Sequence, residues 1–362
     1  YRLDGKYEDS RHPREVTFTP NLEEDLKRRD LTINAMAYND REGLVDLFGG
    51  MKDLEAGIVR CVGDPEERFG EDALRILRAV RFSAQLGYTI EAETLEAVRC
   101  LAPRLSRISA ERIQVELVKL LVSPNPHFLR TAYDTGVTKV FLPELDRCME
   151  TEQRHPHHCY SVGEHILHSL NQVEADRVLR LAMLLHDIGK PDTETVDEEG
   201  ITHFHRHAAV SADLAEGILK RLKFDNETIR MVHKLVLYHD YGNGILPDMT
   251  MARRAVHKIG EDAFPGLFAV KRADIMAQSE YMRQEKLDRL EEWQRLYGEV
   301  MKQKQCVSLK DLAVTGADLI AAGWKPGRAL GETLQKLLEL VLENPEMNKR
   351  EILMEESQRL QN

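Results

Sequence analysis

The sequence GEDALRILRAVRF, from Gly70 to Phe82, sets the pattern for most of this 362-residue chain. Apolar residues recur there at helical spacing, and the predicted face consists of Leu74, Leu77, Val80 and Ala84. Asp72 and Arg75 are three residues apart, so we expect them to project from one face of the helix. A carboxylate accepts hydrogen bonds and a guanidinium donates them, so the pair could contact both kinds of group on a nucleobase edge.

Two further arginines extend this polar stripe. Arg78 and Arg81 continue the three-residue spacing and could hold a triphosphate through bidentate hydrogen bonds. The alternative is an exposed helix face with ordinary ion pairs between neighbouring turns. The spacing alone is compatible with both.

The elements on either side predict a mostly α-helical protein with a small α+β part at its start. Before residue 63 we expect a helix opening at Asn21 and a pair of short strands at 44–48 and 58–62. From Asp72 onward the pattern is helical, with helices at 110–121 and about 278–305.

Composition limits the class of protein. Apolar residues make up 42% and charged residues 31%, as in globular proteins, and no apolar run is long enough to span a membrane. The five cysteines are scattered, which favours the reducing cytoplasm and argues against a disulfide framework. The net charge of −11 argues against nucleic-acid binding unless a local basic face exists, and arginines do crowd between Arg75 and Arg112.

Four segments in order resemble motifs of class II CCA-adding enzymes and the related bacterial poly(A) polymerases. They are RRDLTINAMAY (28–38), DLFGGMKDLEAGIVR (46–60), GEDALRILRAVRF (70–82) and SAERIQVEL (109–117). The resemblance implies that Asp72 and Arg75 read the Watson–Crick edge of incoming CTP or ATP. It implies that the ribose and phosphates are bound by Arg29, Asp30 and Asn34, and that a bracing motif consists of Glu71, Arg112 and Glu116.

One feature of that family is missing from this sequence. Its head domain carries a Gly-Gly-x-Val-Arg loop and an Asp-x-Asp pair that holds two Mg²⁺ ions, and we expect both upstream of Tyr1. In two-metal phosphoryl transfer the ions activate the attacking hydroxyl and neutralise the leaving group. We therefore place no catalytic residue in this chain and expect it to bind nucleotide weakly and not to polymerise.

Histidines are concentrated in the middle of the chain, where 11 of 14 lie between His155 and His239. Their order with two aspartates, H…HD…H…H…D, resembles the HD phosphohydrolase superfamily, which implies six metal ligands: His165, His186, Asp187, His207, His239 and Asp274. Imidazole and carboxylate ligands suit Mn, Ni, Fe or Mg, and such an ion can generate hydroxide for phosphoester hydrolysis. Lys190 could contact a substrate phosphate or simply end a helix in solvent, and the whole domain could be structural.

The C-terminal sequence predicts a helix, a glycine hairpin and a second helix around GWKPGR (323–328). Backbone N–H groups at a helix start bind phosphate, and Lys325 and Arg328 add positive charge there. The segment resembles the family's tRNA-gripping tail, although a hairpin that only closes the bundle would have the same sequence features.

These observations together predict four segments. They are the end of a nucleotidyltransferase head (1–62), a helical nucleotide-selecting neck (63–148), a helical HD metal-binding domain (149–278) and a linker with a tRNA-binding tail (279–362). The implied reaction is CCA addition to tRNA from CTP and ATP in the cytoplasm. The alternatives are A addition or poly(A) synthesis, a stand-alone metal phosphohydrolase, and a non-catalytic tRNA-binding protein. The sequence leaves the oligomeric state open.

Overall fold

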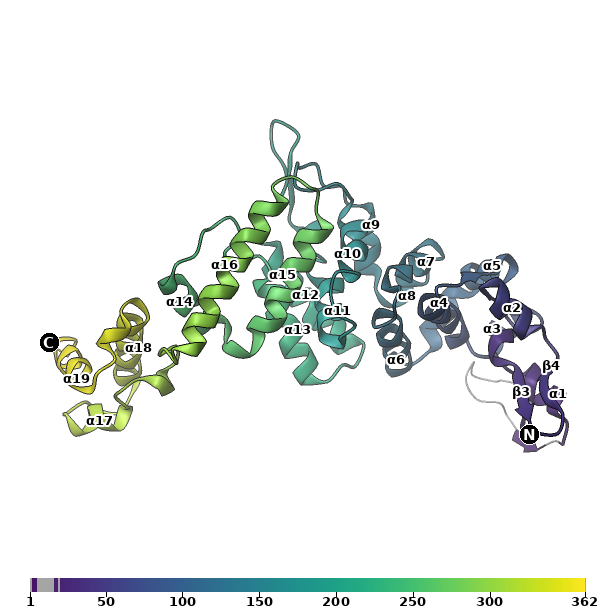
Figure 1. Cartoon of the computed structure of the whole chain (residues 1–362), viewed down its shortest axis with the longest axis horizontal. Coiled ribbons are helices and arrows are strands. Elements are labelled where there is room, and N and C mark those ends of the chain that lie inside the picture. The colour runs from purple at the N-terminus through teal and green to yellow at the C-terminus, as the bar shows by residue number, and fades with distance from the viewer. Residues whose placement is uncertain (1, 5–15, 19, 362) are drawn as a thin grey trace. The chain divides into compact units, whose positions relative to one another are not determined.

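The computed structural model describes residues 2–4, 16–18 and 20–361 (Figure 1). They divide into two compact units, Tyr1–His239 with Ala273–Tyr281, and Asp240–Arg272 with Met282–Asn362. Both units are built mainly from helices, which confirms the predicted mostly α fold. No helix in the described part of the chain has the length and apolarity that a bilayer crossing requires.

The described part of the first sixty residues holds two antiparallel strand pairs and two short α-helices. Antiparallel pairs join β1 (Arg2–Asp4) to β2 (Val16–Phe18) and β3 (Met36–Asn39) to β4 (Gly43–Asp46). Helix α1 (Leu22–Lys27) begins at the predicted cap, where the Asn21 side chain accepts from the Glu23 amide. Helix α2 (Gly50–Ala56) begins after Gly49, whose φ of 76° suits glycine.

The predicted pairing of strands 44–48 and 58–62 is wrong. Strand β4 pairs with β3, whereas β5 (Ile58–Val59) pairs in parallel with β6 (Thr89–Ile90). Strand propensity predicted the two segments as strands. Helix α2 separates them, however, and the chain returns through α4 so that β6 lies beside β5. The partner of each strand therefore depends on tertiary packing that local sequence does not contain.

Four helices follow: α3 (Pro65–Glu71), α4 (Leu74–Leu86), α5 (Ala92–Leu101) and α6 (Ala110–Leu121). Helix α4 packs along α6, and their buried apolar faces include the predicted Leu77 and Val80. The expectation that Asp72 lies on the α4 helix is wrong. Asp72 ends α3 in an extended conformation, with φ −140° and ψ 102°, and its carboxylate accepts from the Leu74 amide.

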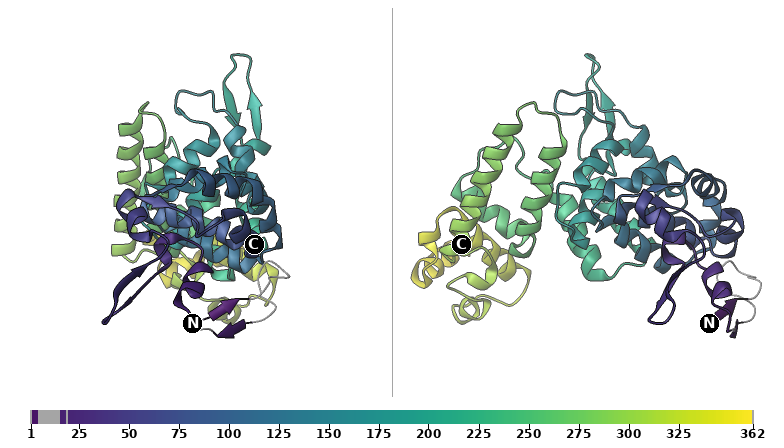
Figure 2. Two further views of the ribbon diagram at one scale, coloured as in Figure 1. Left: turned by 90° about the vertical axis from the view of Figure 1, so that its right-hand side faces the viewer. Right: turned by 45° about the vertical axis from the view of Figure 1, so that its right-hand side comes forward.

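The rest of the larger unit is a helical bundle with one hairpin. Its helices are α7 (Leu129–Asp134), α8 (Thr138–Phe141), α9 (Pro143–Glu150), α10 (Val162–Leu170), α11 (Arg177–Leu185), α12 (His207–Arg221) and α13 (Asn226–Tyr238). Helices α12 and α13 pack extensively against each other, and α13 also packs on α11. The hairpin of β7 (Glu194–Val196) and β8 (Thr202–Phe204) projects away from the helices (Figure 2).

The smaller unit has its own core. Its helices are α14 (Met249–Ile259), α16 (Arg283–Lys302), α17 (Gly316–Ala321), α18 (Arg328–Glu343) and α19 (Arg350–Arg359), while α15 (Phe264–Ala277) crosses the boundary. Leu319, Trp324 and Leu337 are among its buried core residues. The buried Arg253 donates to the carbonyls of Leu342 and Glu343 and so satisfies the C-terminal end of α18. The predicted long charged helix and the helix–hairpin–helix are both present.

Candidate functional site

A cavity of about 610 Å³ lies where α1, η1 (Thr32–Asn34), α4 and α6 meet. It is lined by Arg28, Arg29, Asp30, Asn34, Asp72, Leu74, Arg75, Arg78, Phe82 and Arg112. Six of the seven residues predicted to bind nucleotide are in this lining. Five arginines face two aspartates, so the cavity carries an excess of positive charge that suits a polyanion.

Asp72 and Arg75 both reach the cavity, although one precedes α4 and the other lies on it. Asp72 Oδ2 accepts from Arg112 Nη2 at 2.7 Å, so the predicted bracing arginine holds the carboxylate in place. Arg75 is 9% exposed, and its Nη2 donates to the Arg28 carbonyl at 3.0 Å. Its Nη1 pairs with Glu71 at 2.7 Å. Both groups are therefore pre-oriented at the cavity wall.

The opposite wall is made by the segment after α1. Arg78 Nε donates to Asp30 Oδ2 at 2.6 Å, joining α4 to that segment. Burial lowers the pKa of Arg78, and the Asp30 carboxylate more than reverses this, so the guanidinium stays charged. Arg29 Nη1 donates to the Asn34 carbonyl at 3.1 Å and keeps its side chain 42% exposed.

Arg81 is the one predicted nucleotide-binding residue that does not line the cavity. It is buried, and its Nε donates to Glu116 Oε2 at 2.8 Å. Its guanidinium lies over the Phe82 ring at 3.5 Å from the centroid. Arg81 and Glu116 thus join α4 to α6 beneath Phe82. A spacing of three residues is shorter than one helical turn of 3.6 residues, so successive arginines lie progressively further around the helix. Arg81 is therefore directed away from the cavity.

Sequence reasoning did not assign Arg28, Leu74 or Phe82 to this site. Arg28 and Phe82 lie inside quoted motifs, directly beside residues that were assigned. Their position next to Arg29 and Arg81 was the available signal. Leu74 belongs to the predicted apolar face, so nothing in the sequence indicated that it lines the cavity.

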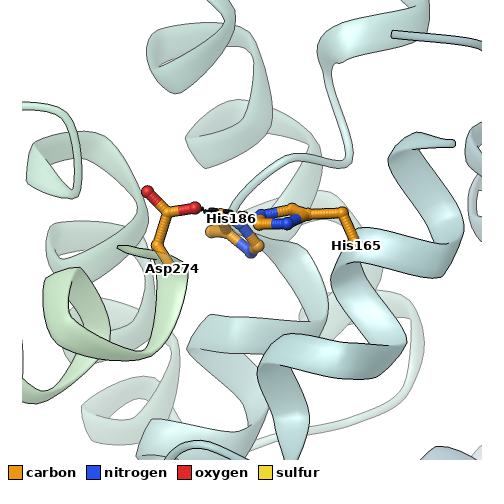
Figure 3. A group of neighbouring side chains, drawn as sticks. All are labelled: His165, His186 and Asp274. Carbon is orange, nitrogen blue, oxygen red and sulfur yellow. Dashed lines mark hydrogen bonds and ion pairs between the residues drawn. The ribbon is translucent and has the colours of Figure 1, made fainter. Parts of the chain in front are cut away.

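The six predicted metal ligands come together in the larger unit, from α10, α12 and α15 and from the residues that directly follow α11 and α13. His165, His186 and Asp274 form one group (Figure 3). Asp187, His207 and His239 form another, and the ligand atoms of each group lie within 4.8 Å of one another. In the first group, His165 Nε2 lies 3.1 Å from His186 Nε2 and 2.9 Å from Asp274 Oδ1. Asp187 stands between the groups.

The two oxygens of Asp187 face different groups. Its Oδ2 lies 3.6 Å from His165 Nε2 and 3.3 Å from His186 Nε2. Its Oδ1 lies 3.3 Å from His207 Nε2 and 3.7 Å from His239 Nε2. One carboxylate can therefore serve two neighbouring cations, one in each group.

Backbone contacts fix the orientation of all four imidazoles. Each Nδ1 faces a carbonyl oxygen: His186 that of Met183, His239 that of Val236, His207 that of Phe204 and His165 that of Ala277. A carbonyl only accepts, so each Nδ1 carries a proton and the Nε2 of each ring points at the centre, where it can bind a metal ion in the neutral form of the ring. The Nε2 atoms that face each other across 3.1 and 3.2 Å need a proton or a metal ion between them. The donor set thus fits a metal.

Charges around this centre are strongly coupled. Burial raises the pKa of Asp187, but His186 and Lys190 bring it well below the usual range. Lys190 is buried, and its Nζ lies 2.7 Å from Asp187 Oδ2 and 2.8 Å from Gln153 Oε1. Burial and the Lys190 charge lower the pKa of the neighbouring His158 to about 3, so that ring is neutral.

The two basic residues predicted for the tail are on the surface of the smaller unit. Lys325 is exposed, and Arg328 is 92% exposed at the start of α18. Arg328 Nε pairs with Glu332 at 2.7 Å. Both side chains are therefore accessible to a large anionic partner.

Comparison with known proteins connects these features to a family. The CCA-adding enzyme of Ligilactobacillus salivarius is 34% identical over 369 residues, covering 99% of this chain and 77% of that protein. The chain belongs to the CCA-adding enzyme family. A second relative, the A-adding tRNA nucleotidyltransferase of Deinococcus radiodurans, is 39% identical over 272 residues, covering 72% of this chain and 61% of that protein.

Three domain families of the CCA-adding enzyme and polymerase group match in succession. "Poly A polymerase head domain" matches residues 1–60, "Probable RNA and SrmB-binding site of polymerase A" residues 87–149, and "tRNA nucleotidyltransferase domain 2" residues 193–356. A solved structure, the Bacillus stearothermophilus CCA-adding enzyme in complex with CTP, has a TM-score of 0.68 and 26% identity, covering 99% of this chain and 79% of that one. The cavity of this family member is built from the first two matched segments and the helix between them.

Proposed function

We propose that this chain serves the addition of C and A residues, from CTP and ATP, to the 3′ end of tRNA. The observation that carries the proposal is the cavity, where an acceptor, Asp72, and a donor, Arg75, are held side by side within a ring of arginines. A triphosphate needs that positive charge, and a base edge needs both hydrogen-bond roles. The family relatives include CCA-adding and A-adding enzymes.

The cavity residues divide into three roles. Asp72 and Arg75 contact the base edge, fixed in place by Arg112 and Glu71. Arg29, Asp30 and Asn34 bind the ribose and phosphates, and Arg78 contributes charge while holding Asp30. Arg81 and Glu116 act indirectly, because they join α4 and α6 and support the Phe82 ring.

Nucleotidyl transfer of this kind uses a divalent metal, and we propose Mg²⁺. Carboxylates that would hold two such ions are not among the cavity residues in the part of the chain that the structure describes. The direct test of the proposal is therefore nucleotide selection. The chain should bind CTP and ATP more tightly than UTP and GTP, measured by equilibrium dialysis. Equal affinity for all four nucleotides would reject the assignment.

The choice between CCA addition and A addition needs a second measurement. Two tRNA substrates separate them, one lacking the whole CCA end and one ending in CC. Incorporation of radiolabelled CMP into the first, with Mg²⁺ present, would assign CCA addition and overturn the expectation that this chain does not polymerise. Incorporation of AMP alone, into the second, would assign the A-adding reaction. Five free cysteines and a tRNA substrate fit a reducing compartment such as the cytoplasm.

A second function is favoured by the histidine–aspartate centre, defined as the six residues of its two groups. We propose that it belongs to the HD type and holds two divalent cations, with Asp187 between them. A bound cation of the Mn, Ni, Fe or Mg class would supply a water of lowered pKa for phosphoester hydrolysis. The four histidines orient such an ion, and Lys190 holds Asp187 from the side. Hydrolysis of bis(p-nitrophenyl) phosphate should require metal and stop in Asp187→Ala.

The surface of the smaller unit gives a role for the tail. We propose that Lys325 and Arg328 contact tRNA phosphates. Replacing both with glutamate should weaken tRNA binding and reduce the slope of log K against log salt by about two, one for each lost phosphate contact. Replacement of Lys349 and Arg359 with glutamate changes the same net charge elsewhere on that unit and should have a smaller effect. Equal effects would assign the loss to net charge alone.

A further inference from the structure

A run of histidine and tyrosine rings leads outward from the histidine–aspartate centre. His158 stands edge-on to the ligand His165, with ring centroids 6.0 Å apart, and lies 6.2 Å from His155. His155 stacks on His157 at 4.9 Å with an interplanar angle of 24°. His157 lies 4.9 Å from Tyr281, which is 53% exposed. These four rings, 155, 157, 158 and 281, are called the ring path below.

Backbone contacts hold the ring path in place. The Ser279 amide donates to the His157 carbonyl at 3.0 Å, and the Ser279 hydroxyl donates to the Pro156 carbonyl at 2.6 Å. These bonds attach the loop to the segment that follows α15, the helix carrying one of the carboxylate ligands. On the other side, Arg154 exchanges two hydrogen bonds with Thr202 of β8. The rings therefore keep a fixed position relative to the ligands.

The ring path and the histidine–aspartate centre together have the two properties that a nucleotide needs. The centre, with cations bound, attracts a phosphoester. Flat aromatic rings stack on nucleobases with little dependence on base identity, because every base presents a π-face. Tyr281 offers an accessible ring at the outer end of the path. A phosphoester without a base would use only the centre.

We propose that the ring path stacks the base of a nucleotide whose phosphoester lies at the histidine–aspartate centre. The substrate class is then a nucleotide, either free or at the end of an RNA strand. This inference rests on the hydrolytic function proposed above. It adds that the site distinguishes nucleotides from simple phosphoesters.

The test uses the manganese-loaded full chain and a reporter without a nucleobase, bis(p-nitrophenyl) phosphate. Inhibition of its hydrolysis by cytidine 5′-monophosphate is compared with inhibition by ribose 5-phosphate. Stacking predicts that the nucleotide inhibits about tenfold more strongly. Tyr281→Ala should remove most of that ratio, and Tyr281→Phe should restore it because the ring is retained. Tyr160→Ala is the matched control, since this exposed tyrosine stacks on His168 outside the ring path.

The outcomes separate the two proposals. Metal-dependent hydrolysis with equal inhibition by both ligands, or an unchanged ratio in Tyr281→Ala, overturns the ring path and leaves the hydrolytic function standing. Absence of hydrolysis overturns the hydrolytic function. The ring path is then tested by equilibrium dialysis with cytidine 5′-monophosphate as the ligand. The protein is manganese-loaded Arg75→Ala, in which the nucleotide cavity is impaired. A further Tyr281→Ala change should weaken binding about fivefold if stacking occurs, and unchanged binding overturns it.

The same assay identifies the source of the nucleotide. A short single-stranded RNA that inhibits more strongly than the mononucleotide assigns the site to RNA ends. Equal inhibition assigns it to free nucleotides. Both results support the stacking of a base on the ring path.

Discussion

The nucleotide cavity and the histidine–aspartate centre lie in one compact unit but differ in the charged groups that line them. The cavity is open and has five arginines against two aspartates, whose carboxylates are already paired with arginine. The centre is almost entirely buried and brings the ligand atoms of four imidazoles and two carboxylates together, within 4.8 Å of one another in each group. The cavity therefore suits an anion that arrives from solvent, and the centre suits cations held within the protein.

The difference also concerns what each site gains from its ligand. In the cavity, internal ion pairs satisfy the charged groups, so the ligand only exchanges one set of partners for another. In the centre, four imidazole Nε2 atoms and two carboxylates converge, and a metal ion is a ligand that all of them can bind at once. Loss of the ligand should therefore affect stability much more at the centre than at the cavity.

The largest expected effect is on metal content. Purified protein should carry one divalent ion for each of the two groups, and Asp187→Ala should lose most of both because Asp187 contacts both. His186→Ala should lose mainly the ion of its own group. His168→Ala is the matched control, because this histidine lies outside both groups and stacks on Tyr160. Elemental analysis measures the content, and unchanged metal in Asp187→Ala would contradict the proposed centre.

Chelation extends the same comparison to stability. A ligand present at about 100 times its Kd stabilises by about 2.7 kcal/mol, so removal of tightly bound metal should lower the Tm by several degrees. At equal free concentrations, CTP should raise the Tm of the same unit much less than the metal does, because stabilisation grows with the ratio of free ligand to Kd and we expect the metal to bind more tightly. Equal shifts would contradict the distinction drawn here.

The second largest effect is on nucleotide affinity. Arg75→Ala should weaken binding of CTP and ATP by about 10- to 100-fold, since one hydrogen bond to a charged group contributes about 1.5–3 kcal/mol. Arg75→Lys keeps the charge but not the planar fork, so its loss should be intermediate. Arg99→Ala, an exposed arginine paired with Glu96, is the control. Fluorescence titration measures the affinity, and a change under twofold in Arg75→Ala would remove this residue from the site.

The two sites differ in how far the sequence predicted them. The structure brings together all six side chains predicted as metal ligands, and their role as ligands stays a prediction. Their order along the chain was a specific signal, because a histidine or aspartate at the right place in the pattern has few other roles. In the cavity, Arg81 turned out to be buried against Glu116 and Phe82. Arginine serves equally as a ligand contact or an internal brace, and only the rotation of the helix decides between them.

The fold shows the same division between local and tertiary information. Helix α6 and the Asn21 cap were predicted because apolar periodicity and capping chemistry are local signals. The parallel pairing of β5 with β6 was not predicted, because its partner lies across two intervening helices. The extended conformation of Asp72 was missed since a helical spacing of charges continues through the break between α3 and α4.

A smaller effect is expected for the residue that fixes Asp72. Arg112→Gln removes the ion pair at Asp72 Oδ2 and lets the carboxylate rotate. The preference for CTP and ATP over UTP and GTP should fall about fivefold, since a net hydrogen-bond contribution is about 1 kcal/mol. Arg107→Gln, exposed on the same unit, is the control. Loss of affinity for all four nucleotides with selectivity intact would show that Arg112 contributes charge rather than orientation.

The smallest expected effect is on the pH dependence of stability, and it concerns the N-terminal cap of α13, the helix that ends at the histidine–aspartate centre. Helix α13 ends at the ligand His239 and begins at Asp225, whose carboxylate accepts from the Thr228 amide and hydroxyl at 2.9 and 2.8 Å. The Thr228 hydrogen bonds, together with Arg177, lower the pKa of Asp225 from 3.8 to about 2. A lowered folded-state pKa means that the ionised cap stabilises the fold above pH 3.8. That stabilisation is lost as the pH falls through 2.

Asp225→Asn keeps a cap acceptor but cannot ionise, so it isolates this effect. The wild-type advantage in urea unfolding should be at most about 1 kcal/mol at pH 5, because solvent screens this exposed charge, and should shrink toward pH 2. Asp213→Asn, an exposed residue within α12, is the control. The measurement needs chelated protein, because acid also protonates the histidine ligands and releases metal from the other end of α13. A wild-type advantage that stays constant from pH 5 to 2 would mean that the carboxylate acts through its shape alone.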